Sequence, residues 1–282
     1  MSLGQLLFES HLGLTERNEG RMITEKLTEG DPRVVLVTGG ARGIGFEIVR
    51  RFMADGYRVA FVATQAKHVQ RALESLSTCS EDRVCAGVVD VTQQTEVTRF
   101  VDQIRNRWGE ITTLVNNAGI SPKRIDESMP WFSQMSTQEW ARVIDVNLGG
   151  PFILIHLLAP AMIANGYGRI VNVGSLAGRA VPLIAGPHYA ASKAGLVGLT
   201  RAAARDLAPY GVTVNCIAPG RVLSDLTGPA EAVVNRSALS RIPLGRFGRA
   251  EEIADLASFL ASPRAGFITG ATIDITGGEF AA

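Results

Sequence analysis

From Arg33 to the C-terminus, short apolar runs alternate with longer segments whose apolar residues recur at helical spacing. Runs of this length, bounded by glycine and polar residues, are typical of strands buried on both sides. Strands that alternate with helices form parallel sheets, because each helix carries the chain back across the sheet. The sequence therefore predicts an α/β fold, with helices on both faces of a doubly wound, parallel, seven-stranded sheet. The expected strands are residues 34–38, 58–63, 83–90, 111–116, 169–174, 212–218 and 271–276.

Two regions depart from this alternation. Residues 1–31 break their few apolar positions with charged side chains, so we expect a polar N-terminal extension outside the fold. Residues 222–248, with several glycines and prolines, are expected to form an irregular, mobile cover. No other change of composition marks a linker, so residues 32–282 are expected to form a single domain.

Charge and cysteine content narrow the classes of partner. The chain carries 28 Lys and Arg against 27 Asp and Glu, a net charge of +1, so no global field attracts nucleic acid or an anionic membrane. We expect no membrane span, because charged residues interrupt the apolar stretches. The three cysteines lack the spacing of a disulfide framework or a metal site. These observations favour a cytoplasmic protein without metal, nucleic-acid or membrane partners.

A glycine cluster follows the first predicted strand. Gly39, Gly43 and Gly45 lie between that strand and a predicted amphipathic helix, with Arg42 and Ile44 among them. Glycines let the backbone approach a pyrophosphate closely, and the free N–H groups at the start of a helix attract the phosphate charge. This context predicts a dinucleotide site in a Rossmann-type fold. The alternative is a glycine-rich turn that binds nothing.

A second cluster has the residue types of an acid/base site. Tyr189 and Lys193 are four residues apart at the start of a predicted helix, so they share one helical face. A tyrosine phenol has a pKa near 10, and an adjacent ammonium favours its phenolate. Ser175 follows the strand predicted at 169–174, at the edge where open α/β sheets bind ligands. Tyr189 is therefore the predicted proton donor or acceptor, with Ser175 holding the substrate oxygen.

Together these motifs resemble the short-chain dehydrogenase/reductases, and the resemblance extends from Arg33 to Gly278. It implies a catalytic set of Ser175, Tyr189 and Lys193, completed by Asn147, which would order a water between Lys193 and solvent. The implied reaction interconverts a carbonyl and a secondary alcohol by hydride transfer from or to a nicotinamide. Residues 32–282 would then be one dinucleotide-binding catalytic domain.

The resemblance also implies further cofactor contacts, each of which alone would equally fit ordinary turn chemistry. Asp90 and Val91 match an adenine contact at the end of the third strand. A second group follows the fourth strand and lines the adenosine side, and a third follows the sixth strand and holds the nicotinamide. These two groups are Asn117, Ala118 and Gly119, and Pro219, Gly220, Val222 and Ser224.

The choice between the two nicotinamide cofactors depends on the residues after the second strand. An acidic residue there would bind a ribose 2′-OH and repel a 2′-phosphate. The sequence instead places Thr64 and then neutral or basic residues at this point, with Arg42 in the glycine loop. NADP(H) is therefore the favoured cofactor, and NAD(H) stays open because Arg42 would also fit a solvated loop charge.

Within the family the chain resembles the 3-oxoacyl-[acyl-carrier-protein] reductases, which implies a ketone or 3-oxoacyl substrate. Ala164, Asn165 and Tyr210 put no charge where an acidic carrier would dock, which argues against carrier binding. One alternative is an NAD-dependent dehydrogenase of a sugar, polyol or hydroxy acid. A second is a non-catalytic NADP(H)-binding sensor. The resemblance further implies a homodimer or homotetramer.

Overall fold

The computed structural model describes residues 33–77, 81–122, 132–181, 185–223, 227 and 232–281. The predicted N-terminal extension, residues 1–31, lies outside the described residues, so the predicted division of the chain stays a prediction.

Seven parallel strands form one sheet in the order β3-β2-β1-β4-β5-β6-β7. This confirms the predicted sheet. The order reverses between β1 and β4, and ligands of such sheets bind outside the carboxyl ends of the strands at that point. The strands are β1 (Val34–Thr38), β2 (Arg58–Ala63), β3 (Val84–Val88), β4 (Thr113–Asn116), β5 (Gly168–Val173), β6 (Val212–Pro219) and β7 (Thr272–Ile275).

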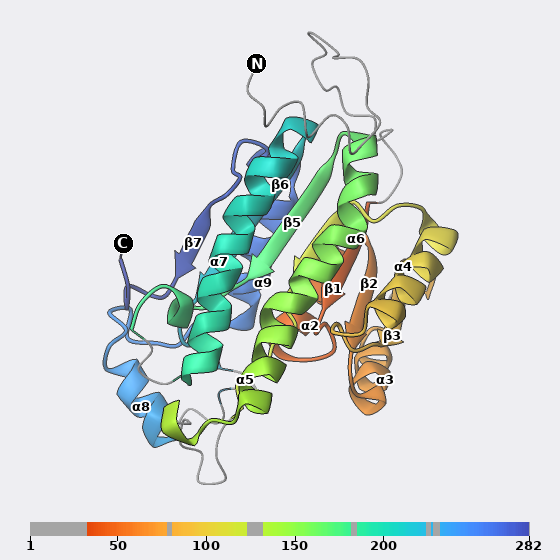
Figure 1. The fold of residues 1–282 in the computed structure, drawn as a ribbon. Coiled ribbons are helices and arrows are strands. Elements are labelled where there is room, and N and C mark those ends of the chain that lie inside the picture. Colours follow the sequence, from red (N-terminus) through yellow and green to blue (C-terminus); the bar gives the residue numbers. More distant parts are fainter. Residues whose placement is uncertain are drawn as a thin grey trace.

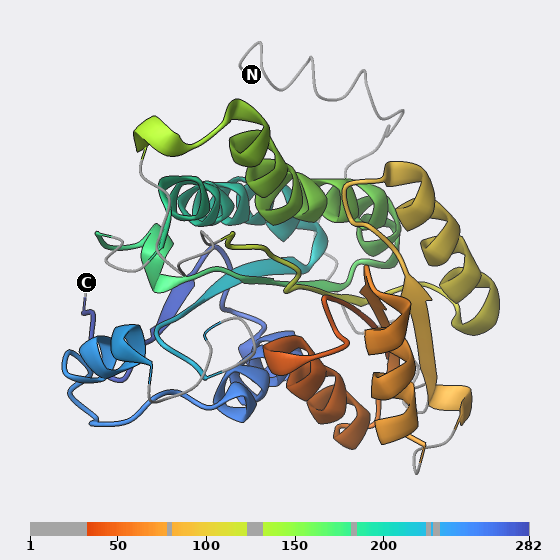
Figure 2. The ribbon, with the colours of Figure 1, turned by 90° about the horizontal axis from the view of Figure 1, so that it is seen from below.

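Helices cover both faces of the sheet (Figures 1 and 2). One face carries α4, α6 and α7, and the other carries α2, α3 and α9. In its described part, the stretch expected to be irregular contains one short helix, α8. The helices are α2 (Gly43–Ala54), α3 (Ala66–Ser75), α4 (Gln94–Trp108), α5 (Thr137–Ile144), α6 (Gly150–Asn165), α7 (Pro187–Leu207), α8 (Val233–Leu239) and α9 (Ala250–Ala261).

The sheet separates two apolar cores. Strand β1 shows why, since alternate side chains of a strand point to opposite faces. Val35 and Val37 pack with α2 and α9, whereas Val34 and Leu36 pack with α4 and α6. Each apolar side chain buried in this way contributes roughly 1.5–3 kcal/mol. The two cores fix the carboxyl ends of the strands, where the candidate site lies.

One helical run is unusually apolar. Residues Thr137–Asn165, which join α5, a π-helical turn and α6, are long and apolar enough to cross a membrane by length and composition, with a mean hydropathy of 1.7. The charged residues in the sequence predicted no such segment, so that prediction is corrected for this run. In the structure 44% of the 18-residue window is buried inside the molecule. Leu154, Leu158 and Met162 supply much of the buried side.

Candidate active site

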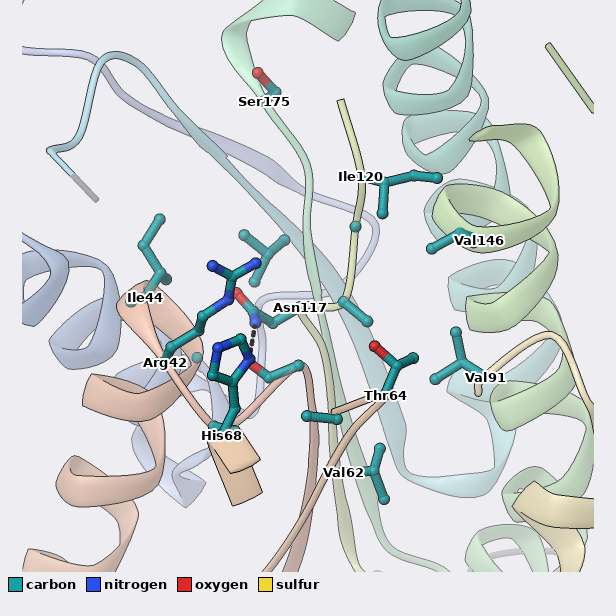
Figure 3. Close-up of a pocket in the computed structure, with 18 of the residues that line it drawn as sticks. Arg42, Ile44, Val62, Thr64, His68, Val91, Asn117, Ile120, Val146 and Ser175 are labelled. Carbon is teal, nitrogen blue, oxygen red and sulfur yellow. Dashed lines mark hydrogen bonds between the residues drawn. The ribbon is translucent and has the colours of Figure 1, made fainter. Parts of the chain in front are cut away.

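A cavity of about 320 Å³ lies at the carboxyl ends of the strands. It runs from the glycine loop and the end of β2 to Ser175, and Figure 3 shows Arg42 and His68 at one end and Ser175 at the other. The structure brings nearly all the predicted site residues to this one cavity. Those that line it are Gly39, Arg42, Gly43, Ile44, Gly45, Thr64, Asp90, Val91, Asn117, Ala118, Gly119, Ser175, Tyr189, Lys193, Pro219, Gly220 and Val222. Ser224 lies outside the described residues.

The glycine loop has the shape of a phosphate cradle. Gly39 has a φ of +64°, which L side chains rarely adopt. A Cβ on Gly45 would lie 2.1 Å from the Gly39 carbonyl oxygen and 2.4 Å from Asn117 Nδ2, so a side chain does not fit there. Helix α2 begins after Arg42 without a side-chain cap bond, which leaves N–H groups of its first turn for a ligand. The loop therefore fits a dinucleotide pyrophosphate.

Thr38, at the end of β1, joins the glycine loop to the segment after β4. Its hydroxyl oxygen accepts bonds from the backbone N–H groups of Asn117 and Ala118, both at 3.0 Å. Asn117 Nδ2 in turn donates to the carbonyl oxygens of Thr38 at 3.0 Å and Gly39 at 3.2 Å. The Asn117 side chain thus has a structural task, which is to hold the glycine loop in place.

The end of the cavity that contains Arg42 and His68 is mainly basic. Asp90 is the only acidic residue among the described residues that line it. Its carboxylate accepts bonds from Thr92 and, at 2.9 Å, from Arg142 Nη2. Burial raises the pKa of Asp90, but the bonds from Thr92 and Arg142 outweigh it and leave the pKa lowered. Thr64 and His68 line this end of the cavity, and their predicted place at the ribose 2′ position of a cofactor stays a prediction.

Tyr189, Ser175 and Lys193 meet at the opposite end. Tyr189 and Lys193 share the first turns of α7, and Lys193 Nζ lies 5.7 Å from the centre of the Tyr189 ring. Nζ donates to the Val173 carbonyl oxygen at 2.8 Å, at the end of β5. Ser175 follows the same strand and forms a hydrogen bond with Tyr189. The group therefore places a hydroxyl, a phenol and an ammonium at one position.

The electrostatics differ from the sequence prediction. Burial raises the pKa of Tyr189, while the hydrogen bond with Ser175 and the charge of Arg221 act to lower it. Burial also lowers the pKa of Lys193 to about 8. The prediction that Lys193 leaves Tyr189 with a depressed pKa is therefore wrong for the protein alone, because burial dominates both groups.

Asn147 lies behind the cavity wall, in the π-helical turn Asp145–Gly149, and is fully buried. Its Oδ1 accepts from Ile120 N–H at 2.8 Å, and its Nδ2 donates to the Ile120 carbonyl oxygen at 3.0 Å. The same Nδ2 is 3.0 Å from Ser192 Oγ on α7. The side chain thus connects three segments, while its predicted part in a water relay stays a prediction.

His188 immediately precedes Tyr189 and is fully buried. Its Nδ1 accepts the Tyr189 backbone N–H at 2.7 Å, so Nδ1 carries no proton. Nε2 then points its hydrogen at Glu139 of α5, with a distance of 3.2 Å to Oε1. His188 anchors the start of α7 rather than facing the cavity.

Sequence reasoning missed several residues around the cavity. Arg142 lines it from a helix that carries no recognised motif, and Ile120 lines it directly after the group Asn117, Ala118 and Gly119. Arg221 follows Pro219-Gly220, and its charge reaches Tyr189. A charged residue at the end of a buried strand was the available signal for Arg221, whereas only the fold places Arg142 near Asp90.

A comparison with known proteins agrees with this geometry. The sequence profile of the short chain dehydrogenases matches residues 33–234. The chain belongs to the short-chain dehydrogenase family. Like the family, it is an NAD(P)-dependent oxidoreductase that interconverts a carbonyl and a secondary alcohol by hydride transfer.

Individual relatives of this short-chain dehydrogenase match along almost their whole length. The 3-oxoacyl-[acyl-carrier-protein] reductase FabG of Staphylococcus aureus is 38% identical over 246 residues, which is 87% of this chain and 97% of the relative. Two crystal structures of a 3-oxoacyl-[acyl-carrier protein] reductase from Brucella melitensis, one with bound NAD, are 34% identical, with TM-scores of 0.84 and 0.82. Each alignment covers 95% of this chain and 100% of that chain.

Proposed function

We propose that this enzyme is an NADP(H)-dependent reductase of a ketone or 3-oxoacyl substrate, with Tyr189 as the general acid. The observation that carries the proposal is the continuity of one cavity between the glycine loop and Tyr189. The names of the relatives support the 3-oxoacyl class, and the absence of an acidic residue at Thr64 supports NADP(H). NAD(H) is the second cofactor to test.

The cofactor would lie along this cavity. The glycine loop, with Gly39, Gly43, Ile44 and Gly45, would hold the pyrophosphate against the start of α2. Arg42 and Thr64 would receive the 2′-phosphate, since a guanidinium binds phosphate well. Other contacts would come from Asp90 and Val91 at the adenine, Asn117, Ala118 and Gly119 along the adenosine side, and Pro219, Gly220, Val222 and Ser224 at the nicotinamide.

The catalytic residues have separate tasks in this proposal. A nicotinamide cofactor, when bound, would supply the hydride that the carbonyl carbon accepts. Tyr189 donates its phenolic proton to the carbonyl oxygen as negative charge develops there. Ser175 donates a hydrogen bond to the same oxygen, which stabilises that charge. Lys193 and Asn147 would return a proton to Tyr189, and the alcohol oxidation runs the same steps in reverse.

For the partners and the location of the protein we propose only general classes. The partner of the site is a small carbonyl or alcohol, and we propose a homodimer or homotetramer. Cys85 and Cys216 are buried free thiols, which suits a reducing cytoplasm.

Replacement of Tyr189 by Phe tests the function. We expect Tyr189→Phe to bind NADPH as the wild type does and to lose kcat by about 10²–10⁴-fold, because only the proton donor is removed. NADPH and NADH titrations followed by turnover of ethyl 3-oxobutanoate measure both properties. Tyr210→Phe, in the turn Ala208–Tyr210 that follows α7, is the matched control and should keep full activity. Equal turnover by Tyr189→Phe would contradict the mechanism.

A further inference from the structure

Tyr189 lies in the first turn of its helix, where support from the helix itself is weakest. It is the third residue of α7, after Pro187 and His188, whereas Lys193 lies one turn further in. The first N–H groups of a helix have no partner within it, and Gly186, which precedes α7, provides no side-chain cap. A proline at the start has no N–H at all. The backbone N–H of Tyr189 therefore depends on an acceptor from outside the helical ladder.

His188 supplies this acceptor. Its Nδ1 lies 2.7 Å from the backbone nitrogen of Tyr189, and the ring is fully buried. An acceptor nitrogen carries no proton, so the proton of the neutral ring is on Nε2. Nε2 faces Oε1 of Glu139 on α5 at a distance of 3.2 Å. This contact fixes both the tautomer and the orientation of the ring.

Glu139 is itself held at the start of α5. The hydroxyl oxygen of Ser136 accepts the Glu139 backbone N–H at 3.0 Å and caps the helix. The Glu139 side chain is 21% exposed, and α5 packs against α7 at this position. A continuous chain of hydrogen bonds therefore runs from the cap of α5 through Glu139 and His188 to the backbone of Tyr189.

We propose that His188, oriented by Glu139, is a positioning residue for the general acid Tyr189. The inference rests on the proposed role of Tyr189 in carbonyl reduction. The direction of a side chain follows from its backbone, so a shift of the first turn would move the phenol away from Ser175, its hydrogen-bond partner. A displacement of about 1 Å can cost a hundredfold in rate. His188 and Glu139 lie outside the lining of the cavity, so they act on the reaction through Tyr189.

Two substitutions of His188 separate the roles of its two nitrogens. His188→Ala removes both, whereas His188→Asn keeps an acceptor oxygen at the place of Nδ1. With NADPH and ethyl 3-oxobutanoate, we expect His188→Ala to lower kcat by about ten- to a hundredfold. KM and the Kd of NADPH should stay within about threefold, because Ser175 and the glycine loop are unchanged. His188→Asn should recover most of the loss in kcat.

Glu139 is tested in the same assay. Glu139→Gln keeps an acceptor for the Nε2 hydrogen and should retain kcat within about twofold, whereas Glu139→Ala should lose about three- to tenfold, the value of one hydrogen bond. Added to His188→Ala, Glu139→Ala should have no further effect, because the chain of bonds is already broken. Gln138→Ala, exposed beside Glu139 on α5, is the matched control and should equal the wild type.

Three results would overturn the proposal. The first is a wild-type kcat in His188→Ala. The second is an equal loss of kcat in His188→Ala and His188→Asn, because the acceptor at Nδ1 would then be irrelevant. The third is a loss of kcat that is matched by a loss of NADPH binding or of folded protein in urea, since His188 would then only support the fold.

Crystal structures of the variants keep the inference separate from the proposed function. In His188→Ala the Tyr189 phenol should leave Ser175 or occupy more than one position, and in His188→Asn it should return. An unchanged phenol in His188→Ala would refute the positioning role, whatever the activity. Full turnover by Tyr189→Phe would instead refute the proposed function and leave the structural result standing.

Discussion

At the scale of single residues, burial sets the chemistry of the site more than any pair of side chains. Lys193 is nearly enclosed, and its pKa falls to about 8 from the ordinary 10.5. A charged ammonium at pH 7 therefore costs stability, on the order of 3 kcal/mol for a shift of this size. Part of the cost is offset by the bond to the Val173 carbonyl oxygen. The enzyme keeps a destabilising group where a proton must move.

Stability as a function of pH follows from this. The unfolded chain keeps the Lys193 proton up to about pH 10.5, whereas the folded protein loses it from about pH 8, so stability rises through this window. Lys193→Met has no proton to lose there. We expect its unfolding free energy relative to the wild type to fall by about 2–3 kcal/mol between pH 7 and pH 10.

Urea unfolding of the cofactor-free proteins at the two pH values measures this change. Lys67→Met, an exposed residue of α3, is the control and should follow the wild type. If the unfolding free energies of Lys193→Met and the wild type changed equally between pH 7 and pH 10, the Lys193 charge would carry no such cost.

Most of the residues that line the cavity were predicted, the glycine loop and the Tyr189-Lys193 pair from spacing that depends on local geometry, and the contacts after the third, fourth and sixth strands from the family resemblance. It did not identify Arg221, whose position near Tyr189 depends on how the chain folds after β6. It also gave the wrong direction for the pKa of Tyr189, because burial cannot be read from a spacing of four residues.

At the scale of elements, the π-helical turn Asp145–Gly149 decides where Asn147 points. Such turns insert one residue into a helix and are frequent at functional sites. Here the turn directs Asn147 toward both Ile120 and Ser192. Helical periodicity alone predicts a continuous helix, so the turn could not be foreseen. The strands were predicted to within two residues at each end, since each is a short apolar run with a glycine or polar end.

Removal of the Asn147 side chain should loosen these elements. Asn147→Ala leaves the Ile120 N–H and carbonyl groups without partners, at a cost of at least about 2 kcal/mol in unfolding free energy. Chemical denaturation measures it, and kcat should fall as well. Asn165→Ala, exposed at the end of α6, is the matched control, with a change within about 0.5 kcal/mol. An Asn147→Ala variant with the stability and activity of the wild type would show that Asn147 does not hold these segments together.

At the scale of the whole molecule, α6 is apolar on its outward side too. Phe152 is 56% exposed and stacks on His156, with 5.9 Å between the ring centres. The structure places the buried side on the sheet and leaves Phe152 outside.

The proposed dimer or tetramer can be tested on this side. We expect the wild type to be at least dimeric by light scattering, and Phe152→Lys to shift it toward the monomer, because a buried lysine charge is costly at an interface. Leu73→Lys, on the exposed side of α3, should leave the assembly unchanged. A monomeric wild type would rule the assembly out, and an unchanged Phe152→Lys would rule out this face.

The bond network of Thr38 with Asn117 also has a consequence for synthesis on the ribosome. The groups that fix the glycine loop all precede residue 120, whereas Ser175, Tyr189 and Lys193 follow it. A growing chain therefore acquires the parts of its nucleotide cradle before the groups that react. The first part of the chain thus specifies the nucleotide cradle, and the second part adds the groups that react.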